Sequence, residues 1–180
     1  MKYNVYGNTM DIFLRLIDDP ILRQKTSSVD KSDLSLILDL KSKIVDIMLK
    51  SGGVAIAANQ VGIAKSFFIM TTESGEAKLF INPLIVDFSN ERSFDEGCLS
   101  IPGVSSKTKR YNTVRLKYLD ENFIEKEIDL KGILAIAAQH EIDHLNGKLY
   151  MDTVTNAQKN LILKKHRDYM KTRNKRSFNG

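Results

Sequence analysis

The segment from Ile133 to Gly147 constrains the fold and the chemistry of this chain more than any other. It begins with six consecutive apolar residues, 133–138, and continues as Gln-His-Glu-Ile-Asp-His-Leu-Asn-Gly. The apolar run predicts a buried helix, and four helical residues turn the chain by about 400°, which places His140 and His144 on one face. The chain has only three histidines. Because burying two of them without partners carries a large desolvation cost, the pattern favours a shared metal ion over a solvated helix face.

Glu141 lies between the two histidines but occupies a different position on the predicted helix. It is about 100° around the helix axis from His140, which is too far for a natural third ligand. It is close enough to contact a water molecule beside the metal. A carboxylate in that place can take a proton from the water and return it to a leaving group. The motif therefore predicts a general base and acid at Glu141.

The third metal ligand is less directly specified. No Glu follows Glu141, and Tyr150 stands where one class of metalloprotease carries a further His. Asp152 and His166 are candidates, although the basic neighbours of His166 oppose a cation and favour a surface position. The best candidate is Cys98, the only cysteine, because two imidazoles and a thiolate leave the fourth tetrahedral position open, as in catalytic zinc sites. The alternative for this cysteine is a small buried apolar residue.

The hydrophobic pattern of the whole chain predicts an α+β fold. Helices are predicted over about residues 30–49, 131–146 and 156–175. Strands are predicted as two hairpins, 66–72 with 77–82 and 113–119 with 124–130. Residues 91–102 are interpreted as a loop or irregular edge. This order predicts antiparallel β-sheets packed around the central His-Glu-x-x-His helix, with N-terminal and C-terminal helices outside them.

Length and composition describe one ordinary domain. The 180 residues are 42% hydrophobic and 27% charged, which excludes a collagen, a disordered tail protein or a disulfide scaffold. We interpret 1–180 as a single catalytic domain, with 1–9 as a candidate flexible extension and 156–180 as a basic helix and tail. No stretch of about 18 apolar residues and no secretory signal is present. A cytoplasmic monomer without membrane association is therefore expected.

Three segments together resemble the signature motifs of the peptide deformylase family, bacterial type. They read Gly53-Val54-Ala55-Ile56-Ala57-Ala58-Asn59-Gln60, Glu96-Gly97-Cys98-Leu99-Ser100 and Gln139-His140-Glu141-Ile142-Asp143-His144-Leu145. They occur in the family's order and at similar spacing, and the resemblance covers roughly residues 10–165. It implies a metal-dependent hydrolase that removes the N-formyl group from the N-terminal formyl-methionine of newly synthesised polypeptides and releases formate.

The resemblance also implies roles for the matched residues. The metal ligands would be Cys98, His140 and His144. The ion would be Fe(II) in the cell, with Zn, Ni or Co able to occupy the same nitrogen and sulfur ligands. Glu141 would transfer the proton from water to the departing amine. The side-chain amide of Gln60 and the backbone N–H of Leu99 would stabilise the negative charge that develops on the formyl oxygen.

The same resemblance implies a peptide-binding cleft. Substrate backbone would pair with Gly53, Val54 and Ala55 on one side and with Gly97 on the other. The methionine side chain would enter a pocket built by Phe94, Ile133, Ile136, Ala137 and His140. From the residues alone, Ile133, Ile136 and Ala137 are simply the buried face of a helix, and the two interpretations are compatible.

One position departs from the family pattern. Ala55 stands where the first motif has its second Gly, and Ile56 stands in place of Leu. The added methyl group lies where substrate backbone approaches closely, and it would be strained if the backbone needed a conformation that only Gly adopts. An inactive or respecialised homologue is therefore the first alternative to an active enzyme.

Positive charge is concentrated at the C-terminal end. Residues 158–180 hold eight Lys or Arg and one Asp, a net charge of +7, whereas the formal charge of the whole chain is +5. A solvated helix face is one interpretation. Attraction to RNA phosphate is the other, and the resemblance implies docking on the ribosome. Two other functions stay open: a nucleic-acid-binding module with a structural metal, and a general metallopeptidase that cleaves unformylated peptides.

Overall fold

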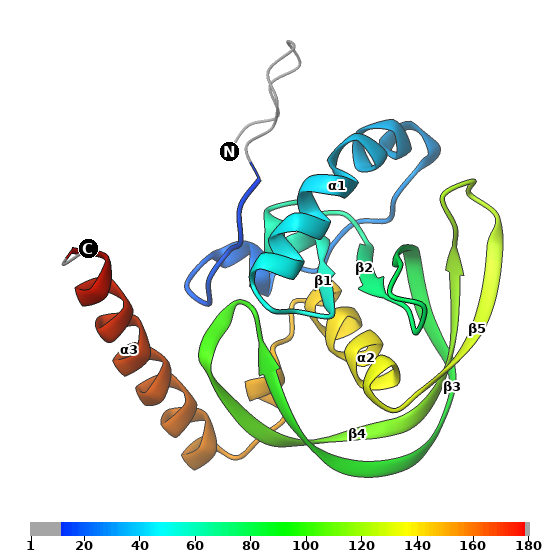
Figure 1. The fold of residues 1–180 in the computed structure, drawn as a ribbon. Coiled ribbons are helices and arrows are strands. Elements are labelled where there is room, and N and C mark those ends of the chain that lie inside the picture. The colour runs from blue at the N-terminus through cyan, green and yellow to red at the C-terminus, as the bar shows by residue number, and fades with distance from the viewer. Residues whose placement is uncertain (1–11, 179–180) are drawn as a thin grey trace.

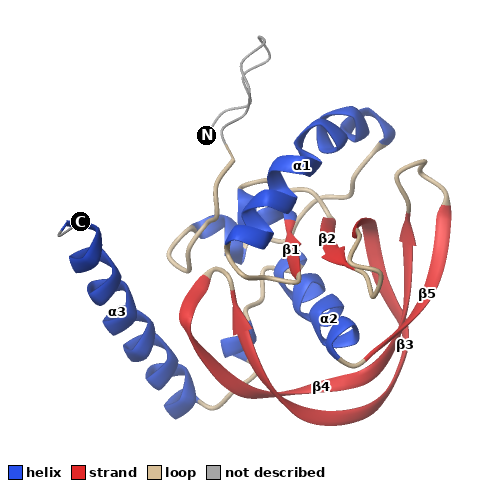
Figure 2. Ribbon diagram, in the orientation of Figure 1, coloured by secondary structure: helices blue, strands red, loops and turns tan. Residues whose placement is uncertain are grey.

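The computed structural model describes the backbone of residues 12–178, and the predicted extension at 1–9 lies outside this part of the chain. One antiparallel sheet of five strands, in the order β1-β2-β3-β4-β5, carries the fold. The strands are β1 (Ala55–Ala57), β2 (Phe67–Thr71), β3 (Ala77–Cys98), β4 (Ile101–Leu119) and β5 (Glu125–Lys131). The long β3–β4 ribbon bends around the central helix (Figures 1 and 2), and its register shifts at three places, the last between Gly97 and Cys98.

Within residues 12–178, three α-helices accompany the sheet. They are α1 (Leu34–Lys50), α2 (Ile133–Leu145) and α3 (Asn156–Phe178). In Figure 1, α2 lies at the centre of the molecule, and α3 lies outside the sheet near the bend of the β3–β4 ribbon. Four short 3₁₀ turns occupy Pro20–Arg23, Lys31–Asp33, Ala58–Val61 and Tyr150–Asp152. None of the helices in the described part of the chain is both long and apolar enough to cross a bilayer.

The alternating side-chain directions of β2 explain how the sheet packs against helices on both faces. Successive side chains of a strand point to opposite faces. Phe67 and Ile69 belong to the core cluster that includes Ile44 of α1, and Phe68 belongs to the cluster that includes Ala135 of α2. All four β2 residues from 67 to 70 are fully buried. The apolar run of this strand therefore reflects burial on both faces, which fixes α1 and α2 relative to one sheet.

The structure confirms the α+β class, both predicted hairpins and all three predicted helices within a few residues. The interpretation of 91–102 as a loop is wrong, because β3 runs through Cys98 and β4 begins at Ile101. Most side chains from Leu84 to Asp95 are exposed. That stretch of strand is held by its hydrogen-bonded partner rather than by burial, so it shows no apolar alternation. β1 is too short, at 3 residues, to be recognised from a pattern.

Phe80 tests the packing between the sheet and α2. Its ring centroid lies 4.7 Å from that of Phe68 and 4.7 Å from that of Tyr118. We expect Phe80→Ala to lower the free energy of unfolding by about 3–5 kcal/mol, since a buried aromatic ring is lost. Urea denaturation measures the change. Leu84→Ala, which truncates a side chain 60% exposed on the same strand, is the control and should shift the midpoint little.

Candidate active site and metal centre

Helix α2 presents both histidines to the interior of the molecule. Gly132, at a φ of +59°, ends β5 and lets the chain turn directly into the helix. His140 and His144 are buried, and their ring centroids lie 4.8 Å apart. The four-residue spacing thus places two imidazoles side by side, as the sequence predicts.

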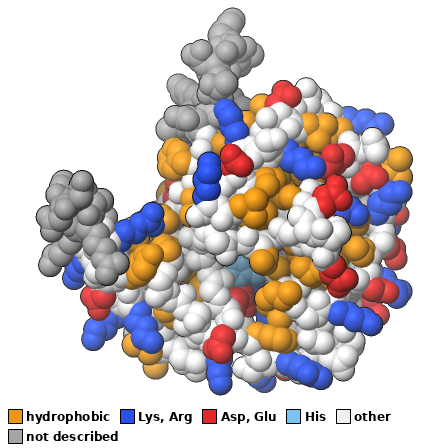
Figure 3. Space-filling view, in the orientation of Figure 1, with side chains coloured by type: hydrophobic (Ala, Val, Ile, Leu, Met, Phe, Trp, Pro, Cys, Tyr) orange, Lys and Arg blue, Asp and Glu red, His pale blue; other side chains and the backbone are white. Residues whose placement is uncertain are grey.

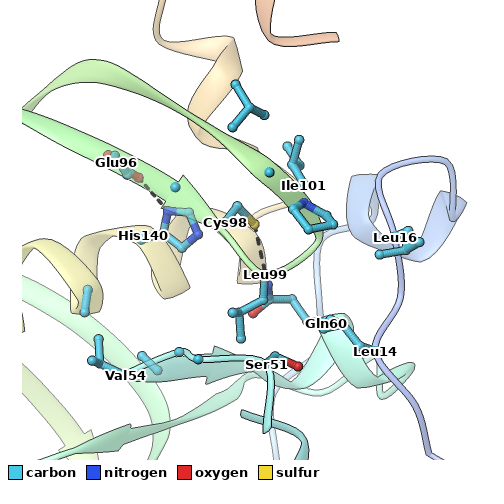
Figure 4. A pocket seen from close by; sticks show the side chains of 18 of the residues that line it. Leu14, Leu16, Ser51, Val54, Gln60, Glu96, Cys98, Leu99, Ile101 and His140 are labelled. Atoms are coloured by element: carbon cyan, nitrogen blue, oxygen red, sulfur yellow. Dashed lines mark hydrogen bonds and ion pairs between the residues drawn. The ribbon is translucent and has the colours of Figure 1, made fainter. Parts of the chain in front are cut away.

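Cys98 comes to the same point from the end of β3. The register shift after Gly97 lies directly before it. Its Sγ is 3.1 Å from Nε2 of His144. Ligand atoms of Cys98, His140 and His144 all lie within 4.8 Å of one another. Figure 4 shows Cys98 and His140 side by side, with Leu99 and Gln60 next to them.

The donor set, one sulfur and two ring nitrogens, suits a tetrahedral metal ion. Bonds of about 2.3 Å to sulfur and about 2.0–2.1 Å to nitrogen separate the ligand atoms of such an ion by roughly 3.3–3.6 Å, which lies between the 3.1 Å from Cys98 to His144 and the 4.8 Å limit for all three residues. Burial and the neighbouring charge of His140 hold the pKa of His144 well below its usual value, which keeps this imidazole in the neutral form that binds metals. Burial opposes a charge on His140, but hydrogen bonds to Cys98 and Glu96 raise its pKa. The surroundings of His140 therefore favour a positive charge at this point.

A buried ion-pair network orients His140. Its Nδ1 lies 2.5 Å from Oε1 of Glu96. Arg110 donates to both carboxylate oxygens of Glu96 at 2.8 Å and to Asp143 at 2.6 Å. Burial raises the pKa of Glu96, but the hydrogen bonds from His140 and Arg110 outweigh it and hold the pKa far below its usual range. An anionic Glu96 keeps the proton on Nδ1, which leaves Nε2 of His140 as the ring nitrogen that a metal ion could bind.

From the sequence, Glu96 belongs to a motif without a role of its own, and Arg110 carries no recognisable signal. The two residues are 14 positions apart on β3 and β4. Only a correct strand register would have paired them, and the prediction of a loop over 91–102 excluded that register.

Glu141 lies beside the metal position on α2. It is 3% exposed, and its Oε2 has no hydrogen-bond partner among the described residues. Burial raises the pKa of Glu141 to about 7, and a cation held nearby would lower it again. A buried carboxylate with an unused oxygen and a pKa near neutrality can accept and release a proton during a reaction.

Gln60 is held with its amide N–H group toward the cysteine. Its Oε1 accepts a hydrogen bond from the backbone N–H of Ala57 at 2.9 Å, which fixes the amide orientation. Its Nε2 donates to Oγ of Ser100 at 3.1 Å and lies 3.6 Å from Sγ of Cys98. The amide is therefore a preorganised donor beside the three candidate ligands.

A cavity of about 1140 Å³ opens over this site. Figure 3 shows a hollow in the surface with a histidine side chain at its bottom. The predicted contact residues on its wall are Gly53, Val54, Ala55, Gly97, Ile133, Ile136 and Ala137. Phe94 is not part of the wall, and its predicted place in the pocket is not supported. Its strand neighbours Asp95, Glu96 and Gly97 line the cavity instead.

Strand β1 lies at one border of the cavity with a free edge. Within residues 12–178 it pairs with β2 alone, so its other side can accept a further strand. Ala55 has no positive φ, and its side chain packs in the cluster that contains Phe68. The backbone at this position is one that any residue adopts, so the methyl group introduces no strain of the kind expected from the sequence.

The other two candidate ligands lie elsewhere. Asp152 pairs with Arg23 and Lys159. His166 is 6% exposed, and its Nδ1 lies 3.0 Å from the carbonyl oxygen of Pro102. Its predicted surface position is wrong, because α3 packs this side chain against β4. The cavity also has walls that the sequence did not reveal, namely Leu14, Leu16 and three residues of α3: Tyr169, Met170 and Arg173.

Arg110 provides a test of the buried network. We expect Arg110→Met to lower the free energy of unfolding by about 3–5 kcal/mol, because Glu96 would remain as a buried charge without its main partner. It should also weaken metal retention by about 10- to 100-fold, since His140 would lose its fixed orientation. Arg115→Met, which breaks an exposed ion pair with Asp129, is the control. Equal losses in both variants, by denaturation and metal titration, would contradict this account.

Comparison with known proteins agrees with the site. The family described as polypeptide deformylase matches residues 14–160. A peptide deformylase of Rhizobium meliloti is 35% identical over 165 residues, which cover 89% of this chain and 94% of the relative. Peptide deformylase 1 of Clostridium perfringens is 42% identical over 140 residues, which cover 77% and 95%. A crystal structure of a peptide deformylase from Legionella pneumophila is 32% identical, with a TM-score of 0.83 over 89% of this chain and 95% of that one. The chain therefore belongs to the polypeptide deformylase family, whose members are hydrolases that remove the N-formyl group from new polypeptides.

Proposed function

We propose that this hydrolase holds one divalent metal ion on Cys98, His140 and His144 and deformylates the N-terminal formyl-methionine of nascent peptides in the cytosol. The observation that carries the proposal is the convergence of a sulfur and two ring nitrogens within 4.8 Å. Two imidazoles and one thiolate leave a tetrahedral position for substrate or water. When bound, the metal supplies a Lewis acid that polarises the formyl carbonyl and makes water more acidic.

The chain's own residues perform the remaining steps. Glu141 takes the proton from the attacking water and delivers it to the departing amine, so that formate and a free N-terminus result. The amide of Gln60 and the backbone N–H of Leu99 donate to the formyl oxygen as it becomes negative. The free edge of β1 and the backbone of Gly97 hold the peptide in an extended conformation. Ile133, Ile136 and Ala137 border the pocket for the methionine side chain.

The proton-transfer role is tested at Glu141. We expect Glu141→Gln to reduce kcat for formyl-Met-Ala by about 10²- to 10⁴-fold, measured as formate release, while metal content stays equal to wild type. Glu76→Gln makes the same change at an exposed position and should keep full activity. Retention of full activity in Glu141→Gln would contradict the proton-transfer role of Glu141.

The metal assignment is tested at the ligands. Cys98→Ser and His144→Ala should each lose bound metal and formate release together, because either change removes one of three ligands. We propose Fe(II) as the ion in the cell, with Zn, Ni or Co as substitutes. Elemental analysis of protein purified anaerobically from iron-replete cells identifies it. An active protein without metal would contradict the assignment.

A substitution at Ala55 tests whether the chain is an active enzyme or an inactive homologue. Because its backbone is ordinary strand, we expect wild type to release formate from formyl-Met-Ala and Ala55→Gly to change kcat/KM by less than about 2-fold, within the range expected of a substitution that makes no new contact. A large gain in Ala55→Gly over an inactive wild type would instead support the respecialised homologue.

We also propose that the basic face of α3 docks on ribosomal RNA. The net charge of +7 in residues 158–180 supports this, since phosphate attraction needs clustered Lys and Arg. Reversing the exposed Lys164 and Lys165 to Glu should weaken co-sedimentation with ribosomes at low salt and leave hydrolysis of formyl-Met-Ala intact. Unchanged sedimentation would contradict the proposal.

A further inference from the structure

The cavity over the metal centre is larger than its reaction requires. Its volume of about 1140 Å³ exceeds the roughly 300–1,000 Å³ of typical small-molecule sites. A formyl group and one methionine side chain would leave part of it unfilled. Its wall includes a segment of α3 that no catalytic role accounts for.

Three α3 residues form this part of the wall: Tyr169, Met170 and Arg173. Tyr169 and Arg173 are four positions apart, so they lie on the same face of the helix, one turn from each other. Tyr169 is 41% exposed although it is a large aromatic residue. The wall thus offers an apolar surface followed by a cation one turn further along the helix.

The α3 wall, as we call these three residues, is fixed to the segment that carries the cysteine. A Cβ at Gly103 would lie 2.1 Å from Cγ of Tyr169, so the ring occupies space that only a glycine leaves. Gly103 also has a φ of +83°, which other residues adopt at a cost. His166 contacts the carbonyl oxygen of Pro102 at 3.0 Å, and Ile162 shares a core cluster with Ile101. The position of the wall relative to Cys98 and Leu99 is therefore set by packing.

The charged residues on the cavity wall differ in whether they have an ion-pair partner. Lys50 lies 3.5 Å from Asp46, and Glu96 and Glu141 belong to the metal centre. Asp95 lines the cavity from β3. No carboxylate among the residues whose side chains are described forms an ion pair with Arg173. Arg173 is the cation of the wall that remains available to a ligand.

We propose that the α3 wall is a specificity-determining subsite for the peptide downstream of the formyl-methionine, in which Tyr169 and Met170 contact apolar side chains and Arg173 favours an acidic side chain. The inference rests on the proposed function, because it assumes that the peptide runs along β1 through this cavity. It assigns to α3 a contact with substrate that is separate from the proposed RNA contact of its outer basic residues.

The experiment uses full-length, metal-loaded protein and formyl-Met tetrapeptides with one Asp placed in turn at positions two, three and four. Each peptide is compared with its Asn counterpart at low ionic strength, where an exposed ion pair is least screened. The measured quantity is the kcat/KM for an Asp peptide divided by that for its Asn counterpart, the Asp/Asn ratio. In Arg173→Glu this ratio should fall by on the order of fivefold at one peptide position, mainly through a higher KM for the Asp peptide. Arg173→Lys should largely retain the wild-type ratio.

Arg167→Glu is the matched control, because it makes the same charge change on an exposed residue of α3 that does not line the cavity. It should leave the ratio unchanged. A second variant, Tyr169→Ala, should raise KM more for tetrapeptides than for formyl-Met-Ala. Equal effects of Arg173→Glu and Arg167→Glu, or no Asp/Asn difference at any position, would overturn the subsite. Failure of wild type to release formate from formyl-Met-Ala would instead overturn the proposed function.

Discussion

The structure depends on how a buried polar cluster on one helix finds its partners. His140, Glu141 and His144 are buried in the C-terminal half of α2, directly after its apolar run, where uncompensated polar groups are costly. The Cys98 thiol and the Glu96 carboxylate, which is itself paired with Arg110, approach them from the sheet. Glu96 and Cys98 come from β3, and Arg110 comes from β4. The sheet therefore supplies the polar partners that allow a helix with these three polar residues to be buried.

The long β3–β4 ribbon makes this possible. It supplies Glu96 and Cys98 from one strand and Arg110 from the other, and it bends around α2 so that all three reach the same helix (Figure 1). The turn at Leu99 and Ser100 closes the ribbon beside Gln60. One hairpin thus provides a candidate metal ligand, the ion pair beside it and the backbone N–H of Leu99. One of the three register shifts of the ribbon lies between Gly97 and Cys98, where the strand redirects its side chains.

The α3 wall relates the proposed hydrolysis to the basic end of the chain. The inner face of α3 packs on β4 and borders the cavity, while its Lys and Arg residues are mostly exposed. If the outer face contacts RNA, as we propose, the same helix would present the enzyme to a source of peptides and contact the peptide itself. Gly103 and Tyr169 are the contact that holds this helix against the catalytic hairpin.

By itself, the sequence determined the elements whose signal is local. The shared face of His140 and His144 follows from helical geometry, the hairpins from short alternating runs, and the position of Glu141 beside the two histidines from its angle on the helix. The tertiary structure decided what depends on distant partners: Cys98 lies 46 residues from His144, and Glu96 meets Arg110 only through strand register. His166, placed on the surface from its basic neighbours, is buried against β4. Phe94, placed in the pocket from the resemblance, is not among the residues that line the cavity. Local pattern records the periodicity of an element, whereas the direction a side chain faces is set by the element packed against it.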